Sequence, residues 1–255
     1  MSLFKKIFRR KTKPPLACSE LPLEELDNHV HTNACFLDIQ PLTVLELYQS
    51  QGCQSCPKNV PEIHKAVSSL APNLALLTFN VTYFDRTEWQ DTLAQKAWDS
   101  RQRAYVARWD RKTIFTPQII VDGVADSTGV TVNDTLEIVE RAREIRKERG
   151  WNIFLDANDT DVRIDSDRAE SVPHDILLAA YDPALQTVKI TKGVNKRKKL
   201  PHRNVVKSVQ KIGVWEGGNL TLPLPDLAEA RRNGWGLLAF VQEPSGGAIV
   251  AAHGV

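Results

Sequence analysis

Apolar positions in the first 150 residues switch between two spacings, which predicts strands and helices in alternation. Nearly continuous apolar runs indicate strands that are buried on both faces. Between such runs, apolar residues recur every three or four positions, as on one face of a helix. This alternation predicts an α/β layer architecture. The expected strands are 43–48, 74–83 and 119–121, and the expected helices are 57–70, 91–109 and 133–149.

The pattern changes after Gly150, where short strands separated by glycine and proline turns predominate. Such spacing is typical of an antiparallel sandwich, although 204–211 fits a helix or a strand equally well. We therefore expect an N-terminal basic tail and extension over 1–41, an α/β domain over 42–150 and a β-rich, sandwich-like domain over 151–255. The strands expected in this last domain are 162–164, 175–181, 187–191, 213–215, 220–222, 236–242 and 248–252.

The composition is that of an ordinary globular protein and argues against several other classes. Hydrophobic residues make up 42% of the chain and charged residues 25%, which is close to the globular average. The formal net charge of +2 gives no reason to expect a nucleic-acid partner. No apolar stretch is long enough for a transmembrane helix.

The first fifteen residues are basic and contain no acidic side chain. They lack the apolar segment of a secretory signal. Three interpretations compete: a solvated tail, a weak membrane-surface anchor and a mitochondrial transit peptide. A cytoplasmic location is the first expectation and a mitochondrial one the second.

The main chemical motif is Gln51-Gly-Cys53-Gln-Ser-Cys56-Pro57. Four cysteines in 255 residues are too few for a disulfide-held scaffold, and the Cys-x-x-Cys spacing instead indicates redox or metal chemistry. Pro57 suits the first turn of a helix, where its missing N–H is not needed. Cys53 is therefore expected at a helix N-terminus, whose dipole stabilises a thiolate. Cys56, one turn behind, is the candidate resolving thiol.

Several segments together carry a family resemblance: residues 45–57, 101–105, 116–123, 204–206 and 213–215. In them the chain resembles the DUF1223 family, a thioredoxin-like group of uncharacterised function. The resemblance implies a thioredoxin-like domain followed by an antiparallel β-rich domain. It also implies that Pro117, after Thr116, is a cis proline lying against the dithiol. The chain departs from many relatives at 80–85, where Asn-Val-Thr-Tyr-Phe-Asp replaces His-Val-Asp-Tyr-Trp-Asp.

Glu46 is a candidate proton acceptor for the resolving thiol. Strand alternation places it on one face with Val44 and Tyr48, and a buried carboxylate beneath a dithiol would have a raised pKa. A carboxylate satisfied by structural partners is the alternative. Arg101 and Arg103 are expected on a solvated helix face with nearby ion pairs.

Two functions follow from these residues. The first is a thiol–disulfide oxidoreductase acting on a protein or small-molecule thiol or disulfide, without a cofactor. Its site would comprise Cys53, Cys56, Pro117 and Glu46. The second is a non-enzymatic thioredoxin-fold module that binds a metal ion or a protein partner through the dithiol region.

A candidate metal set supports the second hypothesis. His29 and His31 lie at i and i+2, a spacing that puts two ligands on one face of an extended segment. Cys35 and Cys18 are the neighbouring thiols. The pattern is looser than that of a structural zinc site.

Overall fold

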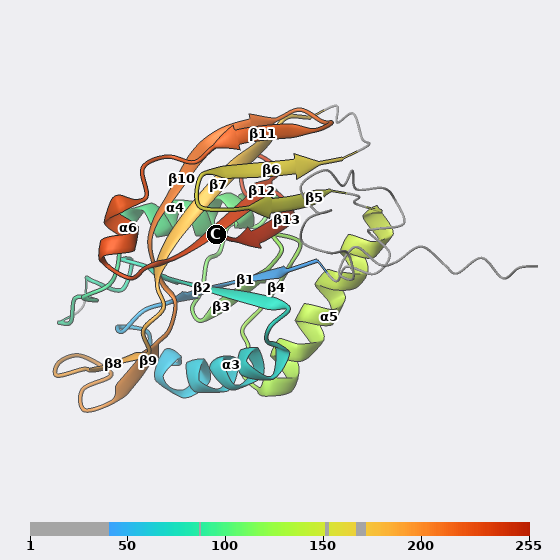
Figure 1. Ribbon diagram of the computed structural model, residues 1–255. Coiled ribbons are helices and arrows are strands. Elements are labelled where there is room, and N and C mark those ends of the chain that lie inside the picture. Colours follow the sequence, from blue (N-terminus) through green and yellow to red (C-terminus); the bar gives the residue numbers. More distant parts are fainter. Residues whose placement is uncertain (1–40, 87, 151–152, 167–171) are drawn as a thin grey trace, which may run out of the picture. The chain divides into compact units, whose positions relative to one another are not determined.

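The computed structural model describes residues 41–86, 88–150, 153–166 and 172–255 (Figure 1). Eight of its strands form one mixed sheet in the order β13-β12-β7-β10-β2-β1-β3-β4. A three-stranded sheet, β11-β6-β5, and a two-stranded hairpin, β8-β9, complete the strands described. The fold is thus mixed α/β with one large sheet.

The N-terminal half alternates strands with helices, as the spacing of apolar residues predicts. β1 is parallel to β2 and antiparallel to β3. Its elements are β1 (Thr43–Gln49), α3 (Cys56–Leu70), β2 (Leu74–Asn80), α4 (Lys96–Arg108), β3 (Gln118–Val121), β4 (Ala125–Ser127) and α5 (Val132–Arg149).

β1 has helices against both of its faces, which explains why all seven of its residues are buried. Leu45 and Leu47 belong to the apolar cluster that α3 and α5 complete. Val44 and Tyr48 belong to a second cluster with Trp98 of α4. Because side chains alternate along a strand, a residue of β1 faces either α3 and α5 or α4. This division separates the candidate site residues.

The C-terminal half continues the same sheet. β10 pairs with β2 in parallel at Val205 and Thr78, and with β7 in the antiparallel sense along its length. The boundary predicted near Gly150 therefore does not separate two sheets. The elements are β5 (Phe154–Ala157), β6 (Asp161–Asp165), β7 (His174–Asp182), β8 (Gln186–Lys189), β9 (Lys199–His202), β10 (Val205–Trp215), β11 (Leu220–Pro223), α6 (Ala228–Arg232), β12 (Gly236–Gln242) and β13 (Ile249–Gly254).

The β11-β6-β5 sheet packs on this part of the large sheet. Leu155, Val162 and Ile164 form one apolar cluster with Ile176 and Trp215. Burial of these side chains stabilises the pair of sheets, since each apolar Å² removed from water contributes about 25 cal/mol. The C-terminal half is therefore locally two-layered, but one of its layers belongs to the sheet shared with β1 and β2.

Element boundaries differ from the prediction where polar side chains accept hydrogen bonds from the backbone N–H groups. β2 ends at Asn80, and the Thr82 N–H then donates to Asp99 Oδ1 at 2.7 Å. α5 begins at Val132, one residue before the predicted start, and is capped by Thr131, whose hydroxyl accepts from the Asp134 N–H at 3.1 Å. The ambiguous segment 204–211 lies in strand β10.

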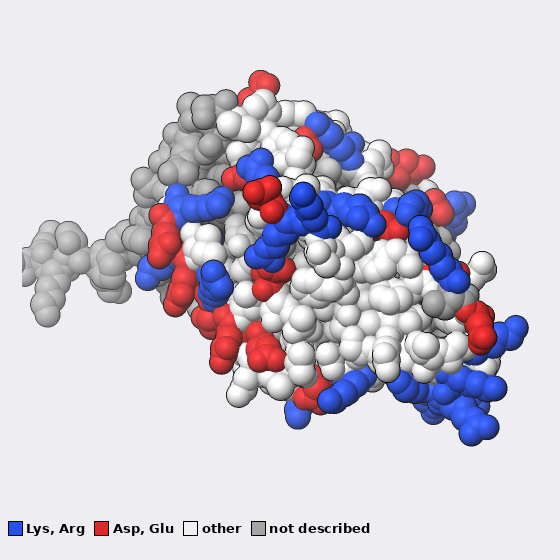
Figure 2. Space-filling view, turned by 180° about the vertical axis from the view of Figure 1, so that it is seen from behind, with Lys and Arg blue, Asp and Glu red and all other residues white. Residues whose placement is uncertain are grey.

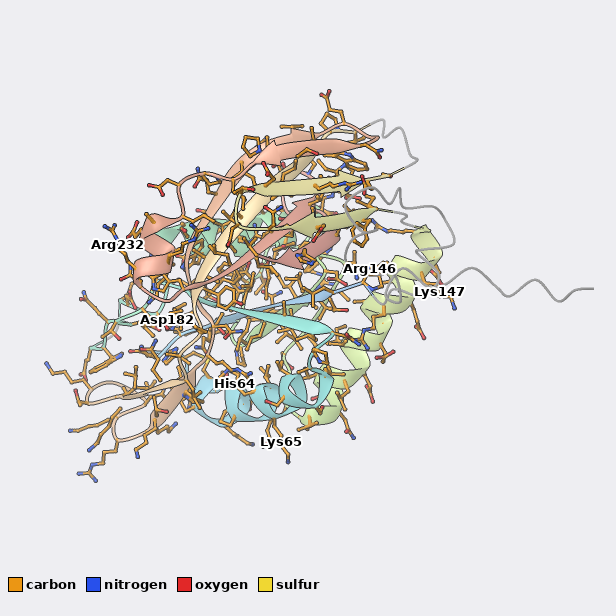
Figure 3. All side chains as sticks on the ribbon, in the orientation of Figure 1. His64, Lys65, Arg146, Lys147, Asp182 and Arg232 are labelled. Carbon is orange, nitrogen blue, oxygen red and sulfur yellow. The ribbon has the colours of Figure 1, made fainter. Side chains whose placement is uncertain are left out.

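One buried ion pair joins α5 to the sheet. Arg146 Nη2 lies 2.9 Å from Asp122 Oδ2 at the end of β3, and Figure 3 shows Arg146 on the sheet-facing side of α5. Asp122 also accepts from the Val44 N–H at 2.8 Å. Burial raises the pKa of Asp122 to about 6, although Arg146 opposes that change.

Candidate functional site

Cys53 and Cys56 lie where the loop after β1 enters α3. Cys56 is the first residue of α3 and Pro57 the second, a position that does not require the proline N–H. Gly52 permits a close approach, because a Cβ there would lie only 2.8 Å from Phe84 Cβ. The loop therefore packs tightly against the 82–86 segment and holds Cys53 at the N-terminus of the helix.

Both thiols are free, and both residues are buried. Cys53 is 2% exposed and Cys56 is 0% exposed. Cys53 Sγ lies 3.2 Å from the Thr116 carbonyl oxygen and 3.3 Å from Ser55 Oγ. The Thr116–Pro117 peptide bond is cis, which is the isomer expected from the resemblance. Because the contacting residue Ser55 is exposed, the Cys53 sulfur lies close to the surface beneath the Ser55 side chain.

The two thiols have opposite acidities. The hydrogen bond with Cys56 lowers the pKa of Cys53 to about 5 despite burial, and the Ser55 hydroxyl adds to this effect. Burial raises the pKa of Cys56 well above its usual range, and the contact with Cys53 raises it further. At neutral pH the pair is therefore a Cys53 thiolate beside a protonated Cys56. An attacking and a resolving thiol need this difference.

Glu46 lies on the opposite face of the sheet from the dithiol. Leu45 and Leu47 share an apolar cluster with Cys53 and Cys56, so alternation along β1 points the Glu46 side chain the other way. The expectation that Glu46 lies beneath the dithiol is therefore corrected by the structure. Sequence alternation correctly grouped Glu46 with Val44 and Tyr48, but it could not tell which face held the cysteines.

Glu46 instead belongs to a buried polar cluster under α4. Its carboxylate accepts hydrogen bonds from Tyr48 at 2.6 Å and Tyr105 at 2.9 Å, and it forms an ion pair with Arg101. Burial alone would lower the pKa of Arg101, but Glu46 together with Tyr105 and Tyr48 outweighs burial and raises that pKa. Arg101 is thus not on a solvated face as expected, whereas Arg103 is exposed.

A second buried polar network lies directly behind the Cys53 loop. Asp91 Oδ2 accepts from the Gln51 N–H at 2.7 Å and from Asn80 Nδ2 at 2.9 Å. Nearby, His202 Nδ1 lies 2.7 Å from Gln49 Nε2. Burial raises the pKa of Asp91 and lowers that of His202 to about 4.

Sequence reasoning missed this network because its members come from four separate segments. One signal was available. Gln49 and Asn80 are the last residues of two strands that pair in parallel, and the carboxyl ends of such strands meet at one edge of a sheet. Polar residues at the carboxyl ends of both strands therefore indicate one buried polar site to which both strands contribute.

The β8–β9 hairpin closes the site from the C-terminal half. Asn195, 1% exposed, donates through Nδ2 to the carbonyl oxygens of Cys53 at 2.6 Å and Gln51 at 2.9 Å. Ile190 and Leu200 lie within the hairpin and join the apolar cluster of the dithiol. The loop that carries Cys53 is therefore held by residues on both sides of the predicted boundary at Gly150.

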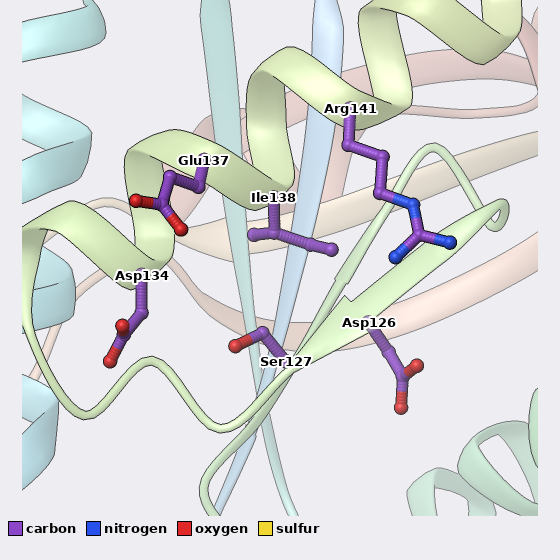
Figure 4. Close-up of a pocket in the computed structure, with 6 residues that line it drawn as sticks. All are labelled: Asp126, Ser127, Asp134, Glu137, Ile138 and Arg141. Atoms are coloured by element: carbon purple, nitrogen blue, oxygen red, sulfur yellow. The ribbon is translucent and has the colours of Figure 1, made fainter.

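Two cavities elsewhere have structural explanations. One of about 220 Å³ lies between β4 and α5 (Figure 4) and is lined by acidic side chains, but Asp126 there binds Arg111 at 2.8 Å and Asp134 belongs to the α5 cap. The other, of about 330 Å³, is lined by Arg101 and Gln242, which belong to the Glu46 cluster. Neither adjoins the dithiol.

The metal hypothesis gains no third ligand from the described part of the chain. Within it, no group of three or more His, Cys, Asp or Glu side chains could hold a metal ion. His29, His31, Cys35 and Cys18 lie outside the described residues, as does the basic tail.

None of the helices in the described part of the chain is both long enough and apolar enough to cross a bilayer.

Comparison with known proteins identifies relatives of this chain. A family model described as "Protein of unknown function (DUF1223)" matches residues 44–242. The crystal structure of protein AGR_C_4864 from Agrobacterium tumefaciens is similar, with a TM-score of 0.67 and 28% identity over 84% of this chain and 94% of that one. HBP35 of Porphyromonas gingivalis shares the fold alone, with a TM-score of 0.53 and 14% identity over 84% and 74% of the two chains. None of the curated proteins matches.

Proposed function

Because the chain belongs to the DUF1223 family, whose function is unknown, we propose a function from its own residues: a thiol–disulfide oxidoreductase on a thioredoxin-like fold. The order of β1, dithiol and α3, followed by the parallel β2 and the antiparallel β3, supports this assignment of the fold. The contact of Cys53 Sγ with the carbonyl oxygen of Thr116, directly before Pro117 and β3, supports it further. The reaction needs no cofactor.

In the first step, the Cys53 thiolate attacks one sulfur of a substrate disulfide. A bond forms between Cys53 Sγ and that sulfur, the substrate S–S bond breaks, and the second substrate sulfur leaves as a thiolate. The pKa of about 5 means that Cys53 is ionised at neutral pH without a general base. Ser55 and Cys56 contribute the hydrogen bonds that stabilise this anion.

In the second step, Cys56 gives its proton to the substrate thiolate released in the first step and attacks Cys53 Sγ. The mixed disulfide breaks, the remaining substrate sulfur leaves as a thiolate, and the Cys53–Cys56 disulfide forms. Two electrons have then passed from the dithiol to the substrate, which is the balance of thiol–disulfide exchange. Forming the mixed disulfide removes the Cys53 charge. One of the causes that raise the pKa of Cys56 thereby disappears at the moment when Cys56 must ionise.

The observation that carries the proposal is the asymmetry of the pair. Cys53 has a depressed pKa and lies beneath the exposed Ser55, whereas Cys56 is completely buried and has a raised pKa. A structural pair of cysteines would have no need for one stabilised thiolate. Stabilising the thiolate favours the reduced state, so we expect the couple to be more oxidising than one with an unperturbed cysteine.

The test is single-turnover exchange with 2-hydroxyethyl disulfide, a small neutral substrate. The reduced wild-type protein should form the internal disulfide, Cys53→Ser should not react, and Cys56→Ser should accumulate a mixed disulfide detectable by its mass. A Cys18→Ser/Cys35→Ser variant is the matched control, because it removes the two other thiols of the chain. Exchange that survives in Cys53→Ser would overturn the proposal.

The alternative, a module that binds a metal ion through the dithiol, is tested in the same preparation. The two thiols alone fill two of the four positions that zinc takes in structural sites. Metal retained at one ion per chain and lost in Cys56→Ser, together with no exchange in the wild type, would favour the module over the enzyme.

A further inference from the structure

The β8–β9 hairpin concentrates positive charge next to the dithiol. Residues 186–202 contain six basic side chains and no acidic one. Since the whole chain has a formal net charge of only +2, the rest of it is net acidic and the charge of the hairpin is local. The six are Lys189, Lys192, Lys196, Arg197, Lys198 and Lys199.

These side chains are exposed, and none of them forms an ion pair within the described part of the chain. Lys198 makes a hydrogen bond to Asn195 at 3.1 Å, which leaves its charge uncompensated. Figure 3 shows the side chains of the hairpin fanning away from the ribbon, and Figure 2 shows Lys and Arg gathered at that end of the molecule. Like charges this close repel each other, so the arrangement costs free energy unless an anion offsets it.

Hydrogen bonds join the hairpin to the loop that carries Cys53. Asn195 lies in its turn and binds the carbonyl oxygens of Cys53 and Gln51. At Gly193 in the same turn, an added Cβ would lie 3.6 Å from Trp89 Cβ, and Trp89 Nε1 donates to Gln51 Oε1 at 2.9 Å. A molecule bound to the hairpin is therefore held close to the loop that carries the attacking sulfur, Cys53 Sγ.

We propose that the β8–β9 hairpin is the docking surface for an acidic, extended protein segment that carries the disulfide or thiol exchanged at Cys53. This inference rests on the proposed function and adds the class of partner to it. Among the strands of the described residues, β8 and β9 pair only with each other, so the hairpin offers a strand edge to which an extended segment can add by backbone hydrogen bonds. Val194, 63% exposed among the basic side chains, gives such a segment an apolar contact that a free anion would not use.

The charges also set the strength and the salt dependence of the encounter. Exposed ion pairs are individually weak, and such contacts weaken as the Debye length falls from about 10 Å at 0.1 M salt to about 3 Å at 1 M. Opposite charges on the partner mainly accelerate association. We therefore expect affinity for an acidic peptide to fall steeply with salt.

The test uses two fluorescent peptides that contain the same disulfide, one flanked by four Glu residues and one by four Lys residues. Binding is measured by anisotropy with the full chain carrying Cys53→Ser, so that no exchange occurs. The Glu peptide should bind at least about tenfold more tightly than the Lys peptide. Adding Lys192→Glu/Lys196→Glu/Lys199→Glu should abolish that preference. The matched control Arg103→Glu/Arg141→Glu/Lys147→Glu changes exposed charges on α4 and α5 and should retain it.

The outcomes separate this inference from the proposed function. Equal affinity for the two peptides, or a preference that survives in the hairpin variant, would overturn the docking surface while exchange with 2-hydroxyethyl disulfide still stands. Absence of exchange in the wild type would overturn the oxidoreductase and, with it, the partner's proposed role. Binding to phosphatidylserine vesicles that is stronger than binding to the Glu peptide would overturn the protein partner in favour of a membrane surface.

Discussion

Replacing Glu46 by glutamine should destabilise the fold and leave thiol exchange unchanged. Glu46 is 0% exposed, and its carboxylate is the ion-pair partner of Arg101. Glutamine has nearly the same volume, but Tyr48 and Tyr105 donate to different oxygens of Glu46 and the amide keeps only one acceptor oxygen. The substitution therefore removes the negative charge and one acceptor oxygen, which leaves the Arg101 guanidinium uncompensated under α4.

The size of the loss in stability depends on the hydrogen bonds that Arg101 retains in the variant. Removing one partner of a buried ion pair costs about 3–5 kcal/mol. Arg101 keeps hydrogen bonds to Tyr105 Oη and Gln242 Oε1, both at 3.0 Å, and its side chain is 15% exposed. We therefore expect a loss near the lower end, about 3 kcal/mol in the free energy of unfolding. Adding Arg101→Met should restore part of it, because the double variant buries no charge.

The assay is urea unfolding followed by circular dichroism at 25 °C, paired with the exchange rate on 2-hydroxyethyl disulfide. Glu137→Gln, at an exposed site on α5, is the matched control and should change stability by less than about 0.5 kcal/mol. A Glu46→Gln variant of unchanged stability whose Cys56 resolves the mixed disulfide slowly would refute this reasoning. That result would make Glu46 the proton acceptor after all.

Three further predictions concern single groups. Cys56→Ala should raise the pKa of Cys53 above about 5, read as thiolate absorbance at 240 nm, because the hydrogen bond from Cys56 is the largest cause of the low value; an unchanged midpoint would contradict this. The folded-state pKa of His202 is depressed to about 4, so its contribution to stability is present above the unfolded value of about 6.5 and about 3 kcal/mol is lost as the pH falls to 4; His202→Gln should flatten the pH dependence of urea unfolding over that range, and parallel curves for the two proteins would refute it. Gly123→Ala should cost more than Gly150→Ala, since both glycines have positive φ but only at Gly123 would a Cβ meet a backbone oxygen, that of Gly247 at 2.4 Å; thermal melts that fall by equal amounts would refute it.

The sequence predicted the elements of the N-terminal half well because local signals and packing agree there. Val60, Ile63 and Val67 have helical spacing and are all buried in α3. Gly150 ends α5 in the left-handed conformation, as its position after Arg149 predicts. The Cys-x-x-Cys motif and the place of Pro57 also follow from local patterns, whereas the cis Pro117 follows from the family resemblance.

The sequence could not predict contacts that depend on the pairing of distant strands. The parallel pairing of β10 with β2 brings residue 205 beside residue 78, and nothing in either segment specifies the other. The same limitation hid which face of β1 the dithiol occupies, so Glu46 was assigned to the wrong neighbours. It also hid Asn195, whose role depends on a hairpin that folds back across 142 residues of sequence.

The seam between β2 and β10 has a consequence for attempts to dissect this protein. A fragment ending at Gly150 would lose the strand beside β2 and uncover Phe79, which packs in a cluster with Val206 and Phe240. Its bare strand edge would invite pairing with other copies of the fragment. The half that contains the cysteines is therefore not an independent folding unit, and transferring it into another chain would require the C-terminal strands as well.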